Sequence, residues 1–265
     1  MYRFLLRPAW IAFHLLVIVA IIVMINLGFW QLRRLDERQA FNAAVEERSA
    51  APPVPLDALL ADPDLDVADA EWRQVTVEGE WLDDQILVFN RSQGGVAGDN
   101  VLSTLVNDEL TVLVNRGFIP LASDVPPSPD GPVEILGRVR ASQTRQTGGL
   151  TDEQGDVIIE VRRVNVDALA PQLPGEVAPV FLDLIASEPP VGSDDPAPVP
   201  PPELGEGNHL SYAVQWFIFA LLAGVGWVLA VRRSINNRRR QASSEAMRRN
   251  CSTTSELVNE GSTVR

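Results

Sequence analysis

Two long apolar runs constrain this chain more than any other feature. Residues 9–30 and 210–231 each provide 22 mainly apolar positions. A helix needs about 20 such residues, at a rise of about 1.5 Å each, to cross a bilayer. We therefore predict two transmembrane helices in contact with lipid. The first run exceeds the core of a signal peptide and no small-residue cleavage site follows it, so we expect an uncleaved anchor.

The distribution of arginine predicts the topology, because cytoplasmic flanks of membrane spans retain Arg and Lys. Eight Arg residues follow the second run, and seven of them lie within residues 232–249: Arg232, Arg233, Arg238, Arg239, Arg240, Arg248 and Arg249. The tail, residues 232–265, is thus predicted to be cytoplasmic, and its lack of apolar periodicity predicts disorder. Two spans then place residues 1–8 in the cytoplasm and residues 31–209 outside. Three Arg residues just after the first run oppose this orientation, but the basic tail outweighs them.

Residue content excludes several functions for residues 31–209. This segment holds 12 Arg against 32 Asp and Glu, which makes it a poor partner for nucleic acid. All 22 basic residues are Arg, and the single Cys251 lies in the tail, so no Schiff-base lysine or external disulfide is available. Of the only two histidines, His14 lies in the first run and His209 directly precedes the second, at the membrane end of the segment, which removes a Ser-His-Asp triad from the external domain. Hydrolase and metalloenzyme functions are therefore disfavoured for this segment.

The external segment reads mainly as β-structure. Apolar alternation or β-rich composition marks seven runs: residues 72–81, 85–91, 100–106, 110–118, 133–141, 156–164 and 178–186. Their spacing predicts an α+β domain over residues 72–187, built on an antiparallel sheet or small open barrel.

The segments that flank this domain have their own signatures. Residues 31–71 are predicted to be a helical extension and a loop, with the helix continuing through residues 37–50 until APPVP breaks it. Residues 188–209 are predicted to be a linker. Seven prolines fall within residues 188–203, which predicts an extended, semi-rigid return to the second span.

Two predicted strands end alike, in FNR at Arg91 and in VNRG at Arg116 and Gly117. Asn and Gly are turn residues, and an Arg at a strand end can pair with one of many carboxylates. The alternative is that these positions bind a partner protein. The residues alone do not decide between the two.

Polar and aromatic residues gather where the first run ends and the second begins. The first contributes Trp30, Gln31 and Arg33 and the second contributes His209, Tyr212, Gln215 and Trp216. The topology puts both groups at the outer interface, where they can meet. An aromatic belt with a snorkelling Arg is one explanation. Offsets of 0, 3 and 7 also place His209, Tyr212 and Trp216 on one helical face, and a neutral imidazole is a good axial ligand for haem iron.

Several motifs occur in an order that resembles the Surfeit locus protein one (Shy-one) family of cytochrome c oxidase assembly factors. They are LGFWQLRR after the first run, WRQVTVEGEW, VLVNRGFIP, and HLSYAVQWF at the start of the second run. The resemblance covers roughly residues 10–232. Phe118, where the family often has Trp, the expanded proline-rich linker and the long basic tail depart from its pattern.

This resemblance implies a non-enzymatic, chaperone-like role in maturing the haem-copper oxidase. The implied partners are oxidase subunit I and haem a synthase, and the implied transient cofactor is haem a. His209 falls on the family's candidate haem contact, surrounded by Tyr212, Gln215 and Trp216, while an Arg such as Arg33 would pair with haem propionates. The short N-terminal extension leaves no room for a mitochondrial transit peptide, so we expect a bacterial plasma membrane. A two-span extracytoplasmic sensor or scaffold is the alternative.

Overall fold

The computed structural model describes residues 3–108, 110–144, 157–190, 192 and 195–260. Two compact units form within the chain. The first comprises residues 1–40 and 205–265, and the second comprises residues 41–204.

The first unit is a pair of helices. A short 3₁₀ turn, η1 (Arg3–Leu6), precedes α1 (Pro8–Ala50), and α5 spans His209–Glu260. Pro8 suits the first turn of α1, where its missing N–H has no helical partner. The helix continues through residues 37–50, as predicted, and ends just before Pro52. Both helices are long and apolar enough to cross a membrane.

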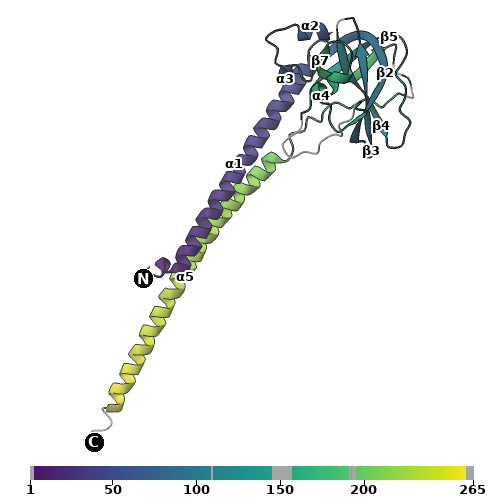
Figure 1. The fold of residues 1–265 in the computed structure, drawn as a ribbon. Helices are drawn as coiled ribbons and strands as arrows, with labels where there is room; N and C mark the ends of the chain where they lie inside the picture. Colours follow the sequence, from purple (N-terminus) through teal and green to yellow (C-terminus); the bar gives the residue numbers. More distant parts are fainter. Residues whose placement is uncertain (1–2, 109, 145–156, 191, 193–194, 261–265) are drawn as a thin grey trace. The chain divides into compact units, whose positions relative to one another are not determined.

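The two helices lie side by side and antiparallel (Figure 1). Residues of α1 that face α5 recur every seven positions, at His14, Ile21 and Gly28. Gly28 permits close approach, because a Cβ added there would lie 2.7 Å from the Phe217 ring. The other faces of the helices expose large apolar side chains; Leu16 is 67% and Leu221 is 66% exposed.

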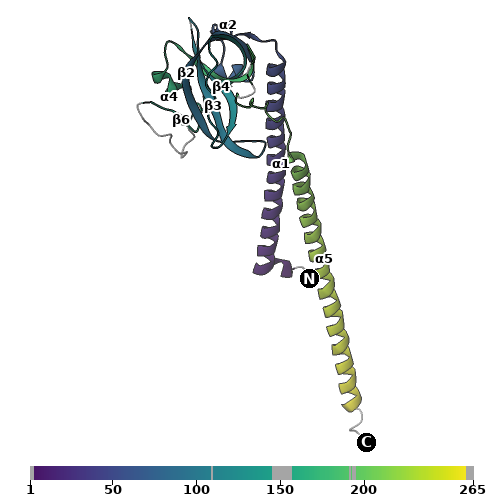
Figure 2. The ribbon, with the colours of Figure 1, turned by 90° about the vertical axis from the view of Figure 1, so that its right-hand side faces the viewer.

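The predicted disorder of residues 232–265 is wrong for the part of the tail that the structure describes. The α5 helix continues to Glu260, and Figure 2 shows it extending past the N-terminal end of α1. No Gly or Pro occurs between Trp227 and Glu260, and the Arg, Gln, Ala and Glu residues of this stretch favour helix. The disorder prediction rested on the lack of apolar periodicity. The high helix propensity of these residues accounts for the helix without it. Residues 261–265 lie outside the described residues.

The second unit is built on a seven-stranded mixed sheet. Its main strands are β2 (Gln74–Gln93), β3 (Val96–Val106), β4 (Thr111–Pro120), β5 (Pro132–Ala141) and β7 (Val177–Glu188). The short strands β1 (Val54–Pro55) and β6 (Glu160–Val161) both pair with β2. The short helices are α2 (Leu56–Leu60), α3 (Val67–Ala70) and α4 (Val166–Leu169), and the 3₁₀ turn η2 (Ala170–Gln172) follows α4.

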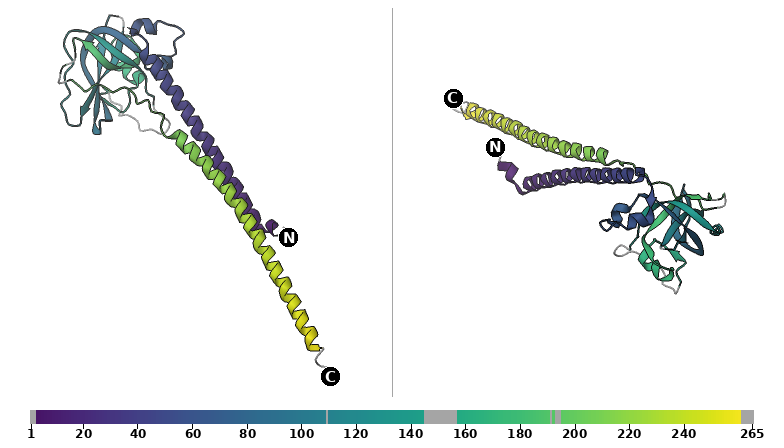
Figure 3. Two further views of the ribbon diagram at one scale, coloured as in Figure 1. Left: turned by 180° about the vertical axis from the view of Figure 1, so that it is seen from behind. Right: turned by 90° about the horizontal axis from the view of Figure 1, so that it is seen from above.

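The five main strands close into a ring of hydrogen-bonded neighbours (Figure 3). The order is β2-β3-β4-β7-β5, and β5 pairs back onto residues 74–80 of β2. The β4–β7 pair is parallel, as are β1–β2 and β2–β6. The predicted antiparallel sheet or open barrel is therefore corrected to a mixed and closed one. Long β2 spans two predicted strands, which lets it pair with both β3 and β5.

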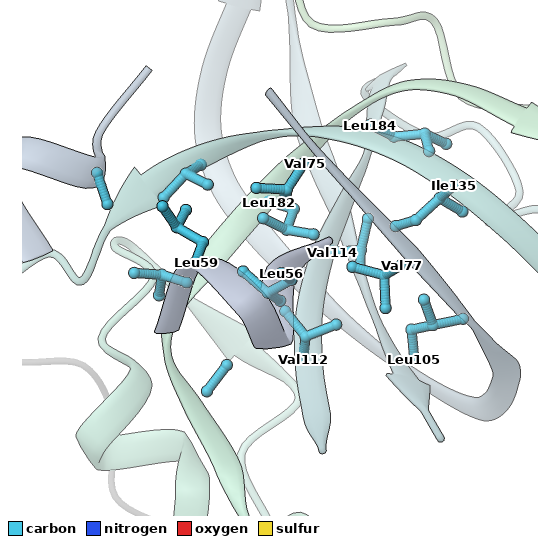
Figure 4. Close-up of a cluster of buried hydrophobic side chains, with 14 of the residues drawn as sticks. Leu56, Leu59, Val75, Val77, Leu105, Val112, Val114, Ile135, Leu182 and Leu184 are labelled. Carbon is cyan, nitrogen blue, oxygen red and sulfur yellow. The ribbon is translucent and has the colours of Figure 1, made fainter. Parts of the chain in front are cut away.

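Two apolar clusters stabilise the barrel. The first fills its interior with alternating residues such as Val75, Val114, Ile135 and Leu182, which α2 covers through Leu56 (Figure 4). The second includes Leu113 and Phe181, which point to the other face of β4 and β7, and is completed by α4. Strand β4 is consequently buried on both faces. Polar residues on this strand must therefore find partners inside the protein.

Candidate functional site

His209 and Gln31 meet across the helix pair of the first unit. Nδ1 of His209 lies 2.8 Å from Oε1 of Gln31. An amide oxygen only accepts hydrogen bonds, so Nδ1 is the donor in this contact, and in the neutral imidazole Nε2 then keeps its lone pair. A hydrogen bond of this kind fixes both the tautomer and the ring orientation of a metal-binding histidine. The geometry thus prepares Nε2 to bind a metal or accept a hydrogen bond.

The segment just before α5 is clamped onto α1 close to His209. Nε of Arg38 donates to the carbonyl oxygen of Gly205 at 2.9 Å, and Nε2 of Gln39 donates to Oε1 of Glu206 at 3.0 Å. Gly207 follows with a positive φ of 69°, a conformation that glycine adopts readily. A Cβ on Gly207 would lie 3.5 Å from Nε2 of His209. The absence of a side chain at Gly207 leaves the lone-pair side of the imidazole accessible.

Two of the other predicted site residues share the face of α5 that carries His209. At about 100° per residue, Tyr212 and Trp216 fall within about 60° of His209 around the helix. Tyr212 is 49% exposed and Trp216 is partly buried. Both residues therefore lie on the face of α5 that carries the imidazole, and the Trp216 ring packs edge-on against Phe219.

The remaining predicted residues do not join this surface. Gln215 is exposed and lies about 120° around α5 from His209. Arg33 is exposed and lies about 160° around α1 from Gln31. Trp30 is 43% exposed, and its ring contacts the guanidinium of Arg34 at 5.8 Å from the centroid. Of the predicted residues, Gln31 thus contacts His209, and Tyr212 and Trp216 share its face of α5.

The second histidine has a separate partner. Nε1 of Trp227 donates to Nδ1 of His14 at 2.8 Å, well along the helix pair from Gln31. The 17 positions between His14 and Gln31 correspond to about 25 Å along a helix. One metal ion cannot bind both histidines of one chain. No group of three or more potential metal ligands occurs among the described residues.

Arg116 and Gly117 hold the proline-rich return segment against β4. Arg116 is only 3% exposed, forms an ion pair with Asp195, and donates to the carbonyl oxygens of Pro126 and Pro127. Phe118 and Ala197 exchange two backbone hydrogen bonds of 2.7 and 2.8 Å. Within the described structure, the VNRG motif thus acts inside the chain, and the linker predicted to be only a spacer is attached to the barrel.

Gly117 is required for that attachment. Its φ is 142°, and a Cβ there would lie 2.3 Å from the carbonyl oxygen of Ala197. Sequence reasoning missed Asp195 and Ala197, because a proline-rich composition carries no signal for specific contacts. The apolar run of β4 is a signal in the sequence that could have indicated such a contact. An Arg inside a buried strand, such as Arg116, needs an internal counter-ion.

Arg91 lies at the far end of β2, where its Nη2 donates to the carbonyl oxygen of Arg162 at 2.9 Å. Burial lowers the pKa of Arg91, and the positive charge of Arg140 lowers it further. Arg91 thus belongs to an arginine-rich region and is not a simple turn residue.

Comparison with known proteins places these motifs in a family. Residues 18–221 match the model of the SURF1 family. An uncharacterized SURF1-like protein of Mycobacterium tuberculosis is 34% identical over 246 residues, which cover 90% of this chain and 89% of that protein. Surfeit locus protein 1 of Homo sapiens is 31% identical over 144 residues, 46% of this chain and 47% of the human protein.

A yeast relative carries a functional name. Cytochrome oxidase assembly protein SHY1 of Saccharomyces cerevisiae is 32% identical over 101 residues, which cover 37% of this chain and 25% of that protein. The family match extends from the first helix of the pair, through the barrel, into the second helix. It includes Gln31, His209 and the VNRG strand. The chain belongs to the SURF1 family.

Proposed function

We propose that this chain is a non-enzymatic membrane assembly factor for a haem-copper cytochrome c oxidase, and that it assists the delivery of haem a to subunit I. The single observation that carries the haem part is the hydrogen bond between His209 and Gln31. The assembly role draws on membership of the SURF1 family and on the printed name of the yeast relative. Haem a synthase is the proposed donor.

The residues present fit a haem. The lone pair of His209 Nε2 is the ligand that haem iron takes from histidine, and Gly207 leaves space on that side. Tyr212 and Trp216 supply flat apolar surface for the macrocycle. When bound, haem a would supply the redox and oxygen chemistry of the oxidase, while this chain would only hold and orient it. This chain would hold the haem through one histidine ligand, His209, which suits transient binding.

The proposal places both α1 and α5 across a bacterial plasma membrane. Their lengths, their apolar composition and the exposed apolar side chains outside the helix seam support this assignment. The basic residues after position 231 support cytoplasmic termini and an extracytoplasmic barrel. The His209–Gln31 site would then lie at the outer interface.

Deletion of the gene tests the assembly role. We expect lower haem a absorbance and oxidase activity in membranes, with unchanged oxidase-subunit transcripts. A sensor would instead change transcription. A normal oxidase spectrum in a strain without a paralogue would contradict the proposal.

Haem binding is tested with the full chain, purified in detergent after co-expression with the enzymes of haem a synthesis. We expect a Soret band from the wild type and its loss from His209→Ala. His14→Ala is the matched control, because His14 lies in the same helix pair but bonds to Trp227. Retention of the band by His209→Ala, or its loss from His14→Ala alone, would rule out His209 as the ligand.

A further inference from the structure

A polar cluster lies on the outer face of the barrel, next to the second apolar cluster. Asn115 of β4 and Asp183 of β7 are paired across these neighbouring strands and follow Leu113 and Phe181 on that face. Asp183 is 2% exposed, and its Oδ1 accepts from Nδ2 of Asn115 at 2.8 Å. A buried carboxylate is thus fixed on a wall that is otherwise apolar.

Arginines surround this carboxylate. Arg138 pairs with Asp183 in the β5–β7 register, and Arg140 projects to the same face of β5 two residues later. Nη1 of Arg140 donates to Oδ2 of Asp183 at 3.0 Å, and its guanidinium stacks 4.3 Å from the Trp72 ring centroid. Each oxygen of Asp183 thus accepts one hydrogen bond, from Asn115 and from Arg140, and Nε of Arg140 also donates to Oε1 of Glu71 at 3.3 Å.

Two arginines near Asp183 each have a buried N–H donor that lacks an acceptor. Nε of Arg91 and Nη1 of Arg138 are buried and have no hydrogen-bond partner among the described residues. Buried polar atoms without partners are uncommon in native proteins and call for an explanation. Here the donors belong to permanent cations, for which the cost of burial is greatest.

The electrostatics agree with the geometry. Burial lowers the pKa of Arg91, and the charge of Arg140 adds to this effect. Burial also lowers the pKa of Arg138; Asp183 opposes that shift and Arg140 reinforces it. Residues 31–209 carry 32 acidic against 12 Arg residues. Within this cluster, however, the three cations Arg91, Arg138 and Arg140 outnumber the two carboxylates described beside them, Asp183 and Glu71. An additional negative group would relieve both the repulsion and the unmet donors.

We propose that Arg91, Arg138 and Arg140 form a binding site for an oxyanion, a carboxylate or phosphate group, on the outer face of the barrel. Guanidinium groups bind both kinds of anion through paired N–H donors. The proposal does not depend on haem binding, because all of these residues lie in the second unit and the haem site lies in the first.

The test is thermal unfolding of the full chain in detergent. The midpoint is measured separately in sodium chloride, inorganic phosphate and succinate, at constant ionic strength. An anion at ten times its Kd should raise the midpoint by about 3 to 6 °C. Comparison of phosphate with succinate identifies which oxyanion the site prefers. Arg91→Gln and Arg138→Gln should lose this anion-dependent rise.

Arg48→Gln is the matched control, since Arg48 pairs with Asp69 elsewhere in the same unit at 2.7 Å and should keep the anion response. In chloride, Arg138→Gln should unfold at the wild-type temperature or higher, because one crowded cation is removed. The proposal is overturned if neither anion stabilises the wild type beyond chloride, or if Arg138→Gln keeps the full response. It is also overturned if Arg138→Gln lowers the midpoint in chloride, which would identify a purely structural arginine.

Discussion

Nδ1 of His209 lies 2.8 Å from Oε1 of Gln31, although 178 positions separate the two residues in the sequence. The bond joins the start of α5 to the middle of α1, and Arg38 and Gln39 of α1 hold the segment that precedes His209. The imidazole is therefore positioned by three contacts from one helix. Gln31 acts on His209 and is a positioning residue, which separates its role from that of the proposed ligand.

Gln31→Leu should weaken haem binding without removing the ligand itself. Loss of the acceptor for Nδ1–H frees the tautomer and the ring, and comparable outer contacts change metal affinity by about 10- to 100-fold. The measurement is a titration of the Soret band in detergent. Gln215→Leu is the control, because Gln215 is exposed on another face of α5. Equal weakening by both variants would show that Gln31 has no special role.

Gly28→Val should loosen the helix pair. A Cβ at this position would lie 2.7 Å from the Phe217 ring, and overpacking costs about 1 to 3 kcal/mol. Thermal unfolding of the detergent-solubilised protein should show a lower midpoint. Gly226→Val is the control, since no atom lies within 4 Å of the corresponding Cβ. The double variant with Phe217→Ala should recover part of the loss; strict additivity would contradict this packing model.

The sequence predicts the helices of this site better than their contacts. Hydrophobic runs locate α1 and α5. The predicted membrane topology then puts Gln31 and His209 at the same depth, near the outer interface. The rotation of each helix, however, depends on how Gly28 and Phe217 pack. For this reason the cluster predicted from composition included Arg33 and Gln215, which the structure turns away from the imidazole.

A similar limit applies to the barrel. Alternating residues identify the main strands, but alternation carries no information on strand direction or on which strands pair. The parallel β4–β7 pair and the closure of β5 onto β2 were therefore missed. The sequence places Arg116 at the end of a strand, where an Arg side chain can reach solvent. In the structure β4 is buried on both faces, so the Arg116 side chain is only 2% exposed and pairs with Asp195.

Gly117→Ala should release the proline-rich segment from β4. The added Cβ would meet the carbonyl oxygen of Ala197 at 2.3 Å, and the backbone there is glycine-like. Trypsin cannot cut this segment, because the chain has no Lys and no Arg lies between residues 163 and 232. A glutamate-specific protease is therefore the suitable probe. Cleavage after Glu203 should become faster. Gly131→Ala also has a positive φ but has open space around it, so it should leave this cleavage rate unchanged.

Asp183→Asn should destabilise the barrel, because it removes the carboxylate that Arg140 and Asn115 share. Breaking one side of a fully buried ion pair costs about 3 to 5 kcal/mol. The loss here should fall below that range, because the Arg140 side chain is 24% exposed and keeps its contact with Glu71. Chemical denaturation monitored by tryptophan fluorescence measures the loss. Adding Arg138→Gln should recover part of it, because the crowded positive charge then falls by one. If the two substitutions add independently, Arg138 and Asp183 are not coupled, and the electrostatic description of this cluster is wrong.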